Sequence, residues 1–213
     1  MTSSLPKKNI AQRPSAAQCL LASALFQAIE RREADKAVQL ALWVERLDDH
    51  AESRNCDSPL LSAARHSHGL PMKVFEALLP RSNPRKRNIE GQTALMHAAA
   101  GNHAHTQDLI RLLLPLSDPM ALTRGGASAL DCSMGLPGFW PARVNLDNIA
   151  LFLPTADLEQ RNALGQTPLE RARATGSQDL LNLILSEMSR REALSISEAA
   201  TPSQAPARAS SRL

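Results

Sequence analysis

Leucine and small apolar residues recur along the chain at a long and nearly constant interval. The leucines stand at positions 25, 60, 95, 130 and 169, so the intervals are 35, 35, 35 and 39 residues. A small residue follows each leucine three positions later: Ala28, Ala63, Ala98, Ser133 and Ala172. Residues three apart lie on one face of a helix. The pattern therefore predicts a short helix at each leucine, with a small side chain that lets a neighbouring helix approach closely.

A second landmark repeats in phase with the first. The pairs Leu79-Pro80, Leu114-Pro115 and Leu153-Pro154 lie 35 and 39 residues apart, and each closes an apolar stretch. Proline directly after such a stretch marks the end of a helix. Each repeat is therefore predicted to hold two helices. We expect the repeats near residues 20–54, 55–87, 88–122, 123–161 and 162–191.

A repeat of this length cannot bury its apolar face alone, so neighbouring repeats must stack. The predicted fold is an all-α solenoid of helix-turn-helix repeats over residues 18–191. Residues 1–17 and 192–213 are rich in Ser, Pro, Ala and Gln. We expect both segments to be disordered tails, of which the first is basic.

The segments that end at two of the leucines are nearly identical, namely Gly91-Gln92-Thr93-Ala94-Leu95 and Gly165-Gln166-Thr167-Pro168-Leu169. The glycine supplies a positive φ at a turn, and the threonine caps the helix that follows. This pattern resembles the ankyrin repeat, and the resemblance spans roughly residues 19–190. It implies an ankyrin-type stack, with turns that project from it.

The sequence departs from that family at the position after each leucine, where the family has histidine. This chain has Phe26, Leu61, Met96, Asp131 and Glu170 there. Asp131 and Glu170 have a physical role of their own, because each lies three residues after a capping Ser or Thr. Such a pair predicts a capping box.

Composition and charge limit the fold class and the kinds of partner that the chain can have. Apolar residues make up 43% of the chain and aromatic residues only 3%, which favours helices over sheets. The net charge is +3, and the segment before residue 19 supplies it through Lys7, Lys8 and Arg13. Residues 19–191 carry equal numbers of acidic and basic side chains. A neutral body of this kind gives no strong case for a nucleic-acid partner.

No catalytic or cofactor-binding motif is present in the sequence. A Gly-rich phosphate loop, HExxH and GxSxG are all absent, so we expect neither enzymatic activity nor a cofactor. The three cysteines, Cys19, Cys56 and Cys132, show no CxxC spacing, and we expect buried thiols in a reducing compartment.

Histidines gather in the middle of the chain, at positions 66, 68, 97, 103 and 105. One alternative is a metal-dependent module that uses His97, His103 and Cys132. Their spacing is that of the repeat rather than that of a ligand set, so we expect no metal site.

Two further segments leave alternatives open. The run Arg81, Arg85, Lys86 and Arg87 contains no acid and is either a solvated connection or a site for an acidic partner or nucleic acid. The longest repeat carries an insertion with Phe139 and Trp140. These aromatic side chains either anchor a partner or fold back over the helices.

The resemblance implies that a partner protein is gripped by the turn tips and by the surface of the first helices. The candidate partner-binding residues are Arg54, Asn55, Asp57, Arg65, His66, Ile89, Glu90, Gln92, Arg124, Leu136, Phe139, Trp140, Leu164 and Gln166. The partner itself is not identified by these residues, because one scaffold serves unrelated targets.

We therefore predict a protein–protein interaction module or adaptor, without a small-molecule substrate and without a membrane span. A cytoplasmic location is expected. The first 29 residues contain no acid and are rich in Ser and Ala, so a bacterial effector exported into a host cell is a second hypothesis. Binding of nucleic acid or of an acidic partner through residues 81–87 is the alternative function.

Overall fold

In the computed structural model, residues 15–50, 56–135, 144–162 and 164–200 are described. Within these residues the regular structure is helical, without a β-strand. The α-helices are α1 (Ala16–Glu30), α2 (Ala34–Trp43), α3 (Pro59–Arg65), α4 (Met72–Leu78), α5 (Ala94–Ala100), α6 (Thr106–Leu113), α7 (Ala129–Ser133), α8 (Leu146–Phe152), α9 (Pro168–Thr175) and α10 (Gln178–Ala200). Short 3-10 helices η1 (Leu47–Asp49), η2 (Leu79–Arg81) and η3 (Leu153–Thr155) follow α2, α4 and α8.

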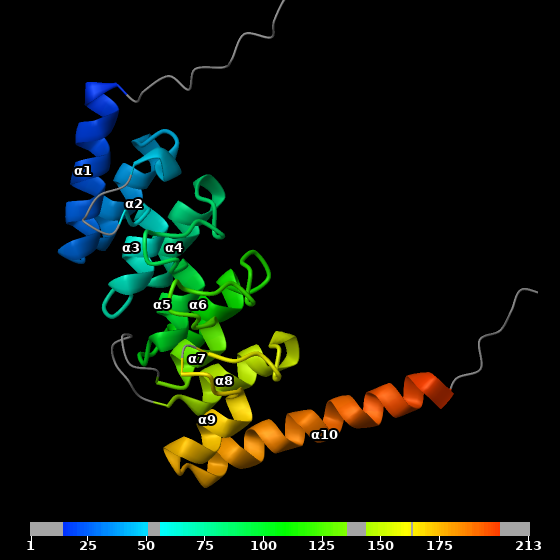
Figure 1. Ribbon diagram of the computed structural model, residues 1–213. Helices are drawn as coiled ribbons and strands as arrows, with labels where there is room; N and C mark the ends of the chain where they lie inside the picture. Colours follow the sequence, from blue (N-terminus) through cyan, green and yellow to red (C-terminus); the bar gives the residue numbers. More distant parts are fainter. Residues whose placement is uncertain (1–14, 51–55, 136–143, 163, 201–213) are drawn as a thin grey trace, which may run out of the picture.

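The helices form consecutive pairs that stack in chain order from α1 and α2 to α9 and α10 (Figure 1). The first helices pack in one layer, with α1 on α3, α3 on α5 and α5 on α7. The second helices α2, α4, α6, α8 and α10 pack in the other. The predicted all-α helical repeat solenoid is therefore confirmed.

Polar side chains begin the first helices as the sequence predicted. The hydroxyl oxygens of Ser58, Thr93, Ser128 and Thr167 accept hydrogen bonds from the backbone N–H three residues later. Both predicted capping boxes are present. Asp131 Oδ2 accepts from the backbone N–H of Ser128 at 2.9 Å, and Glu170 Oε2 accepts from that of Thr167 at 2.9 Å. These bonds satisfy N–H groups that have no partner within the helix.

The core is built from the two sequence landmarks. The leucines at 25, 60, 95 and 130 are buried, and so are all five small residues that follow the leucine positions by three. The Leu-Pro pairs end the second helices, because α4, α6 and α8 stop one residue before Leu79, Leu114 and Leu153. Cys132 is buried as expected, but Cys19 and Cys56 are exposed, so the prediction of three buried thiols is wrong.

Both ends of the helical stack differ from the predicted boundaries. α1 begins at Ala16 with Ser15 as its cap, two residues before the predicted start of the solenoid at residue 18. α10 continues to Ala200, past residue 192, where the sequence placed a tail. No Gly or Pro interrupts this segment, and the carboxylate of Glu187 pairs with Arg190 and Arg191 at helical spacing. The helix projects away from the stack (Figure 1).

Candidate protein-binding surface

The turn tips between repeats share one hydrogen-bonded geometry. The backbone N–H of Asn88, Thr123 and Asn162 donates to the carbonyl oxygen four residues later, at 3.0, 2.9 and 2.9 Å. The glycines at 91, 126 and 165 lie in these turns with φ of 75°, 77° and 70°. A glycine reaches this region without the strain that a Cβ causes. Cys56 takes the equivalent position with φ of 55°, so that turn holds a strained residue.

Asparagine side chains fix two of the tips internally and tie them to the preceding repeat. Asn88 Oδ1 accepts from the backbone N–H of Glu90 and Gln92, and Asn162 Oδ1 accepts from that of Leu164 and Gln166. The Nδ2 group of Asn88 donates to Asp57 Oδ1 at 2.8 Å, and that of Asn162 donates to Asp131 Oδ1 at 3.4 Å. These tips are therefore held in place before any partner arrives.

The tips also contact one another through the backbone. The N–H of Arg124 donates to the carbonyl oxygen of Glu90 at 2.8 Å. A Cβ built at Gly91 would lie 3.0 Å from the nitrogen of Arg124, which is too close for a relaxed side chain. Gly91 is thus required both by its positive φ and by the approach of the next tip.

Three of the predicted partner-binding residues meet in a network inside the stack. The guanidinium of Arg65 lies 2.9 Å from Asp57 Oδ2, and its Nη2 is 3.5 Å from Gln92 Oε1. Asp57 is only 3% exposed, so its proposed contact with a partner is wrong. Its carboxylate instead serves as the acceptor that joins two repeats.

His97 completes this network from helix α5. Its Nε2 lies 3.1 Å from Gln92 Oε1, so the neutral ring donates there. Burial, and then the positive charges of Arg65 and His66, lower the pKa of His97 from 6.5 to about 3. Burial also lowers the pKa of His66, the candidate residue that follows α3. The imidazole of His97 is therefore neutral at pH 7.

Exposed candidates lie on the tips themselves. Ile89 is 38% and Leu164 56% exposed, and Glu90 and Arg124 are also exposed. Gln166 is partly buried, and its buried Oε1 has no hydrogen-bond partner. Arg54, Asn55, Leu136, Phe139 and Trp140 fall outside the described residues, so the structure does not place them.

The histidine cluster does not converge on one point. His103 Nε2 lies 2.8 Å from Ser67 Oγ, whereas His97 faces Gln92. Burial raises the pKa of the Cys132 thiol, which disfavours the thiolate that a metal would need. Within the described part of the chain, no three His, Cys, Asp or Glu residues gather as a metal-binding group.

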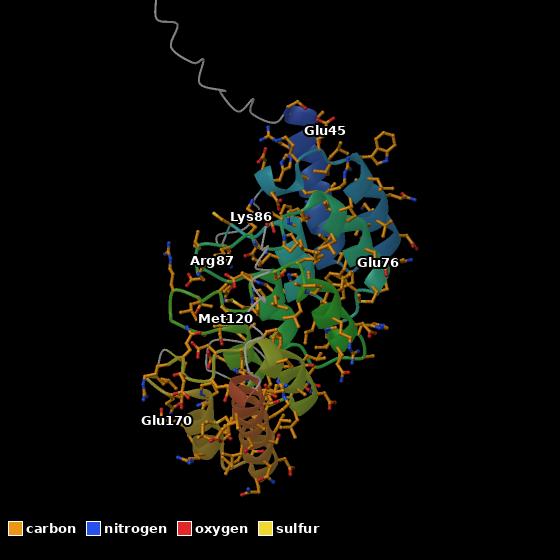
Figure 2. The ribbon with its side chains drawn as sticks, turned by 90° about the vertical axis from the view of Figure 1, so that its right-hand side faces the viewer. Glu45, Glu76, Lys86, Arg87, Met120 and Glu170 are labelled. Atoms are coloured by element: carbon orange, nitrogen blue, oxygen red, sulfur yellow. The ribbon has the colours of Figure 1, made fainter. Side chains whose placement is uncertain are left out.

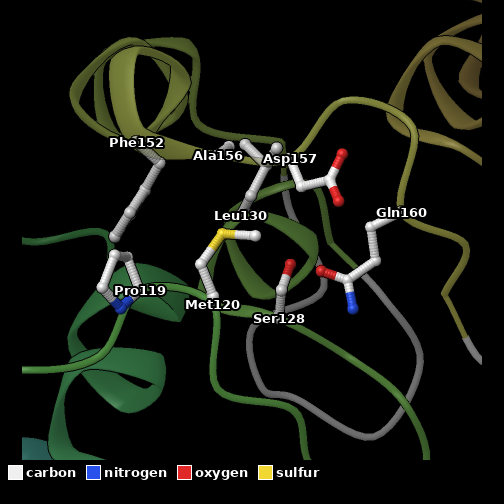
Figure 3. Close-up of a pocket in the computed structure, with 8 residues that line it drawn as sticks. All are labelled: Pro119, Met120, Ser128, Leu130, Phe152, Ala156, Asp157 and Gln160. Carbon is white, nitrogen blue, oxygen red and sulfur yellow. The ribbon is translucent and has the colours of Figure 1, made fainter.

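A crevice lies between the loop before α7 and the loop after α8. Figure 3 shows Pro119 and Met120 on one side and Phe152, Ala156 and Asp157 on the other. Its volume is about 10 Å³, which is close to the space of a single water molecule. This crevice is therefore too small for an organic ligand.

The basic run uses many of its donors within the protein. Arg81 Nη1 donates to the carbonyl oxygens of Ala41 and Leu42, at 2.9 and 2.5 Å. Arg85 Nε donates to the carbonyl oxygen of Leu116 at 3.4 Å, and Arg87 Nε to that of Gly91 at 3.1 Å. The guanidinium groups are thus positioned against backbone carbonyls and remain at the surface.

Sequence reasoning missed the most exposed described aromatic residue, Trp43, which is 70% exposed beside Leu42 at 61%. The helical spacing of the apolar residues in α2 could have predicted this exposure. Ala37, Ala41 and Val44 follow the i, i+4, i+7 spacing of one face and are all buried. Residues 42 and 43 fall off that face, so both large side chains point outward.

Comparison with known proteins gives one family match. Residues 90–124 match the family model described as Ankyrin repeat. A search of curated proteins found no match. None of the helices in the described ranges is long and apolar enough to cross a membrane.

Proposed function

We propose that the chain is an adaptor that binds another protein through its turn tips and the adjoining surface of its first helices, as the match of residues 90–124 to the ankyrin repeat and the stacked helix pairs suggest. The observation that carries this proposal is the exposure of Ile89 and Leu164 on tips whose backbones are already fixed by Asn88 and Asn162. Apolar side chains on a rigid projecting turn lose little conformational entropy when a partner covers them.

The proposed contact surface contains charged groups beside these apolar anchors. Glu90 and Arg124 are exposed on neighbouring tips and are joined through their backbones. Arg65, His66, Gln92 and Gln166 border this surface, partly buried. Arg54, Asn55, Leu136, Phe139 and Trp140 remain candidates by their positions in the sequence. Asp57 is excluded because it is buried.

A matched pair of double variants tests the proposal. Ile89→Ser with Leu164→Ser removes the apolar anchors from the tips. Leu20→Ser with Leu185→Ser makes the same chemical change at exposed leucines of α1 and α10. Each full-length protein is used as bait in native lysate, and captured proteins are quantified by mass spectrometry after circular dichroism has confirmed equal helix content.

We expect one protein to be captured by the wild type and by the α1/α10 control, and to be lost with the tip variant. Equal capture by all three proteins would remove the tips from the interface. A folded wild type that captures nothing would argue against binding by the repeats themselves.

The effector hypothesis concerns location rather than the binding surface. It is supported by the absence of acidic residues and the abundance of Ser and Ala in residues 1–29. Fusion of these residues to a reporter tests it directly. A reporter that stays in the producing cell, under conditions in which a known exported control leaves it, would end this hypothesis.

Nucleic-acid binding through residues 81–87 stays an untested alternative. Those arginines donate to backbone carbonyl oxygens, a role that needs no nucleic acid. A filter-binding titration with duplex DNA at two salt concentrations tests the alternative, since phosphate contacts make affinity fall steeply with salt.

A further inference from the structure

A second exposed surface lies beside the turn tips, on the loops that follow the second helices. It comprises residues 42–43 at the end of α2 and the loops 79–87 and 116–121, and it is named the loop edge below. In Figure 2, Lys86, Arg87 and Met120 lie along one margin of the stack. The loop edge combines exposed apolar side chains with basic ones, and its apolar members are Leu42, Trp43, Leu116 and Met120.

Contacts between repeats make the loop edge continuous. Arg81 reaches back to the carbonyl oxygens of Ala41 and Leu42, and Arg85 reaches forward to that of Leu116. Ser117 Oγ donates to the carbonyl oxygen of Pro84 at 3.5 Å. These bonds join the end of the first repeat to the loop of the third repeat. The exposed ends of three successive repeats are therefore linked to one another along this edge.

The basic side chains of the loop edge lack acidic partners. Among the described residues, no carboxylate forms an ion pair with Arg81, Arg85 or Arg87. The nearby carboxylate of Asp118 accepts a hydrogen bond from the backbone N–H of Met120 at 3.0 Å. Positive charge therefore prevails here, although residues 19–191 as a whole carry balanced charge.

A hollow in the loop edge gives this charge a shaped surface. It is lined by Arg85, Arg87, Ser117, Asp118, Pro119 and Ala121 and has a volume of about 350 Å³. The Nε donors of both arginines are bonded to carbonyl oxygens, which restrains the guanidinium groups at its wall. Arginines that are already positioned lose less entropy when they bind a carboxylate.

We infer that the loop edge binds a segment of a partner protein in which Asp or Glu residues alternate with large apolar residues. Carboxylates match the arginines, and apolar side chains match Trp43, Leu42, Leu116 and Met120. Tryptophan and arginine are the residue types that contribute most at protein interfaces. A nucleic acid fits less well, because its phosphates would face the exposed apolar side chains of this surface, which have no role in such a contact.

The experiment selects the ligand from a displayed library of random short peptides, with the full-length protein as bait. Enriched peptides are synthesised with a fluorescent label, and their affinity is measured by anisotropy. The loop-edge variants are Arg81→Gln with Arg85→Gln, and Trp43→Ala. The matched control is Arg111→Gln with Arg173→Gln, which removes the same charge from exposed positions of α6 and α9.

We expect enriched peptides that combine carboxylates with apolar residues. Their affinity should fall at least about tenfold in both loop-edge variants and less than about twofold in the control. The inference is overturned if no peptide is enriched, if the enriched peptides lack acid, or if both double variants weaken binding equally. Tighter binding of duplex DNA, lost in the same variants, would also overturn it and assign the surface to nucleic acid.

The tip variant Ile89→Ser with Leu164→Ser separates this inference from the proposed function. Unchanged peptide affinity in that variant supports a distinct loop-edge site. Affinity that falls in the tip variant but not in the loop-edge variants refutes the loop-edge inference and leaves the proposed function intact.

Discussion

Lowering the pH from 7 to 5 should destabilise the stack through His97. This imidazole is neutral in the folded chain because its pKa is lowered from 6.5 to about 3 by burial and by the nearby positive charges. In the unfolded chain its pKa returns to the ordinary value. Between these two values the unfolded chain binds a proton that the folded chain excludes. The stabilisation is therefore complete above pH 6.5 and is lost as the pH falls towards 3.

The size of the effect follows from proton linkage. Full uptake of one proton on unfolding changes the free energy of unfolding by about 1.4 kcal/mol per pH unit. Uptake is slight at pH 7 and nearly complete at pH 5, so this one side chain should account for a loss of about 2 kcal/mol over that range. Such a loss is a substantial share of the stability of an ordinary domain.

Urea denaturation followed by circular dichroism at pH 7, 6 and 5 measures the effect. His97→Gln keeps a polar side chain of similar length but removes the titrating group. The difference in free energy of unfolding between wild type and variant should shift by about 2 kcal/mol from pH 7 to pH 5, in favour of the variant. His105→Gln, at an exposed site, controls for loss of an imidazole. Parallel pH curves for wild type and His97→Gln would refute the reasoning.

Three further predictions concern the turns and the contacts between repeats. Cys56→Gly should raise the free energy of unfolding by about 0.5–1 kcal/mol, because relief of the left-handed strain exceeds the added entropy of the unfolded chain; an unchanged urea midpoint would contradict this. Asn148→Ala should lower it by about 2 kcal/mol, because the buried amide donates to two carbonyl oxygens near the end of α5; a loss below about 0.5 kcal/mol would show that water replaces those bonds. A double-mutant cycle of Asp57→Ala and Asn88→Ala should give a coupling free energy of about 1–3 kcal/mol, and additive effects would show that this hydrogen bond does not link the second repeat to the third.

The helix pairs were predictable because their signals act locally. A capping hydroxyl such as that of Thr93 needs only the N–H three residues on, and Pro80 ends a helix whatever surrounds it. The repeat pattern then predicted that the helix pairs stack, because a single pair cannot bury its apolar face alone. The end of α10 was not predictable in this way, because the segment past residue 192 is rich in Ser and Ala, like the tail, yet continues a helix held by Glu187 and its arginines.

The candidate surface was harder to predict because exposure depends on the neighbouring repeat. Asp57 and Gln92 occupy equivalent positions, each directly after the residue with positive φ in its turn. Asp57 is nevertheless buried, because the side chains of Asn88 and Arg65 contact its carboxylate. Trp43 was overlooked for the opposite reason. The insertion around Trp140 stands out by its composition, whereas Trp43 is marked only by its place outside the buried face formed by Ala37, Ala41 and Val44.

The polar contacts between repeats restrict the ways in which such a chain can gain or lose a repeat by duplication or deletion. Asn88 of the third repeat requires the carboxylate of Asp57 in the second, and Asn162 of the fifth requires that of Asp131 in the fourth. The third and fourth repeats meet differently, through Asn148 and the carbonyl oxygens of Ala99 and Gly101. Similar helix pairs are therefore not interchangeable modules. Excision of one pair would bring together donors and acceptors that do not match, so the order of the repeats is itself encoded in these side chains.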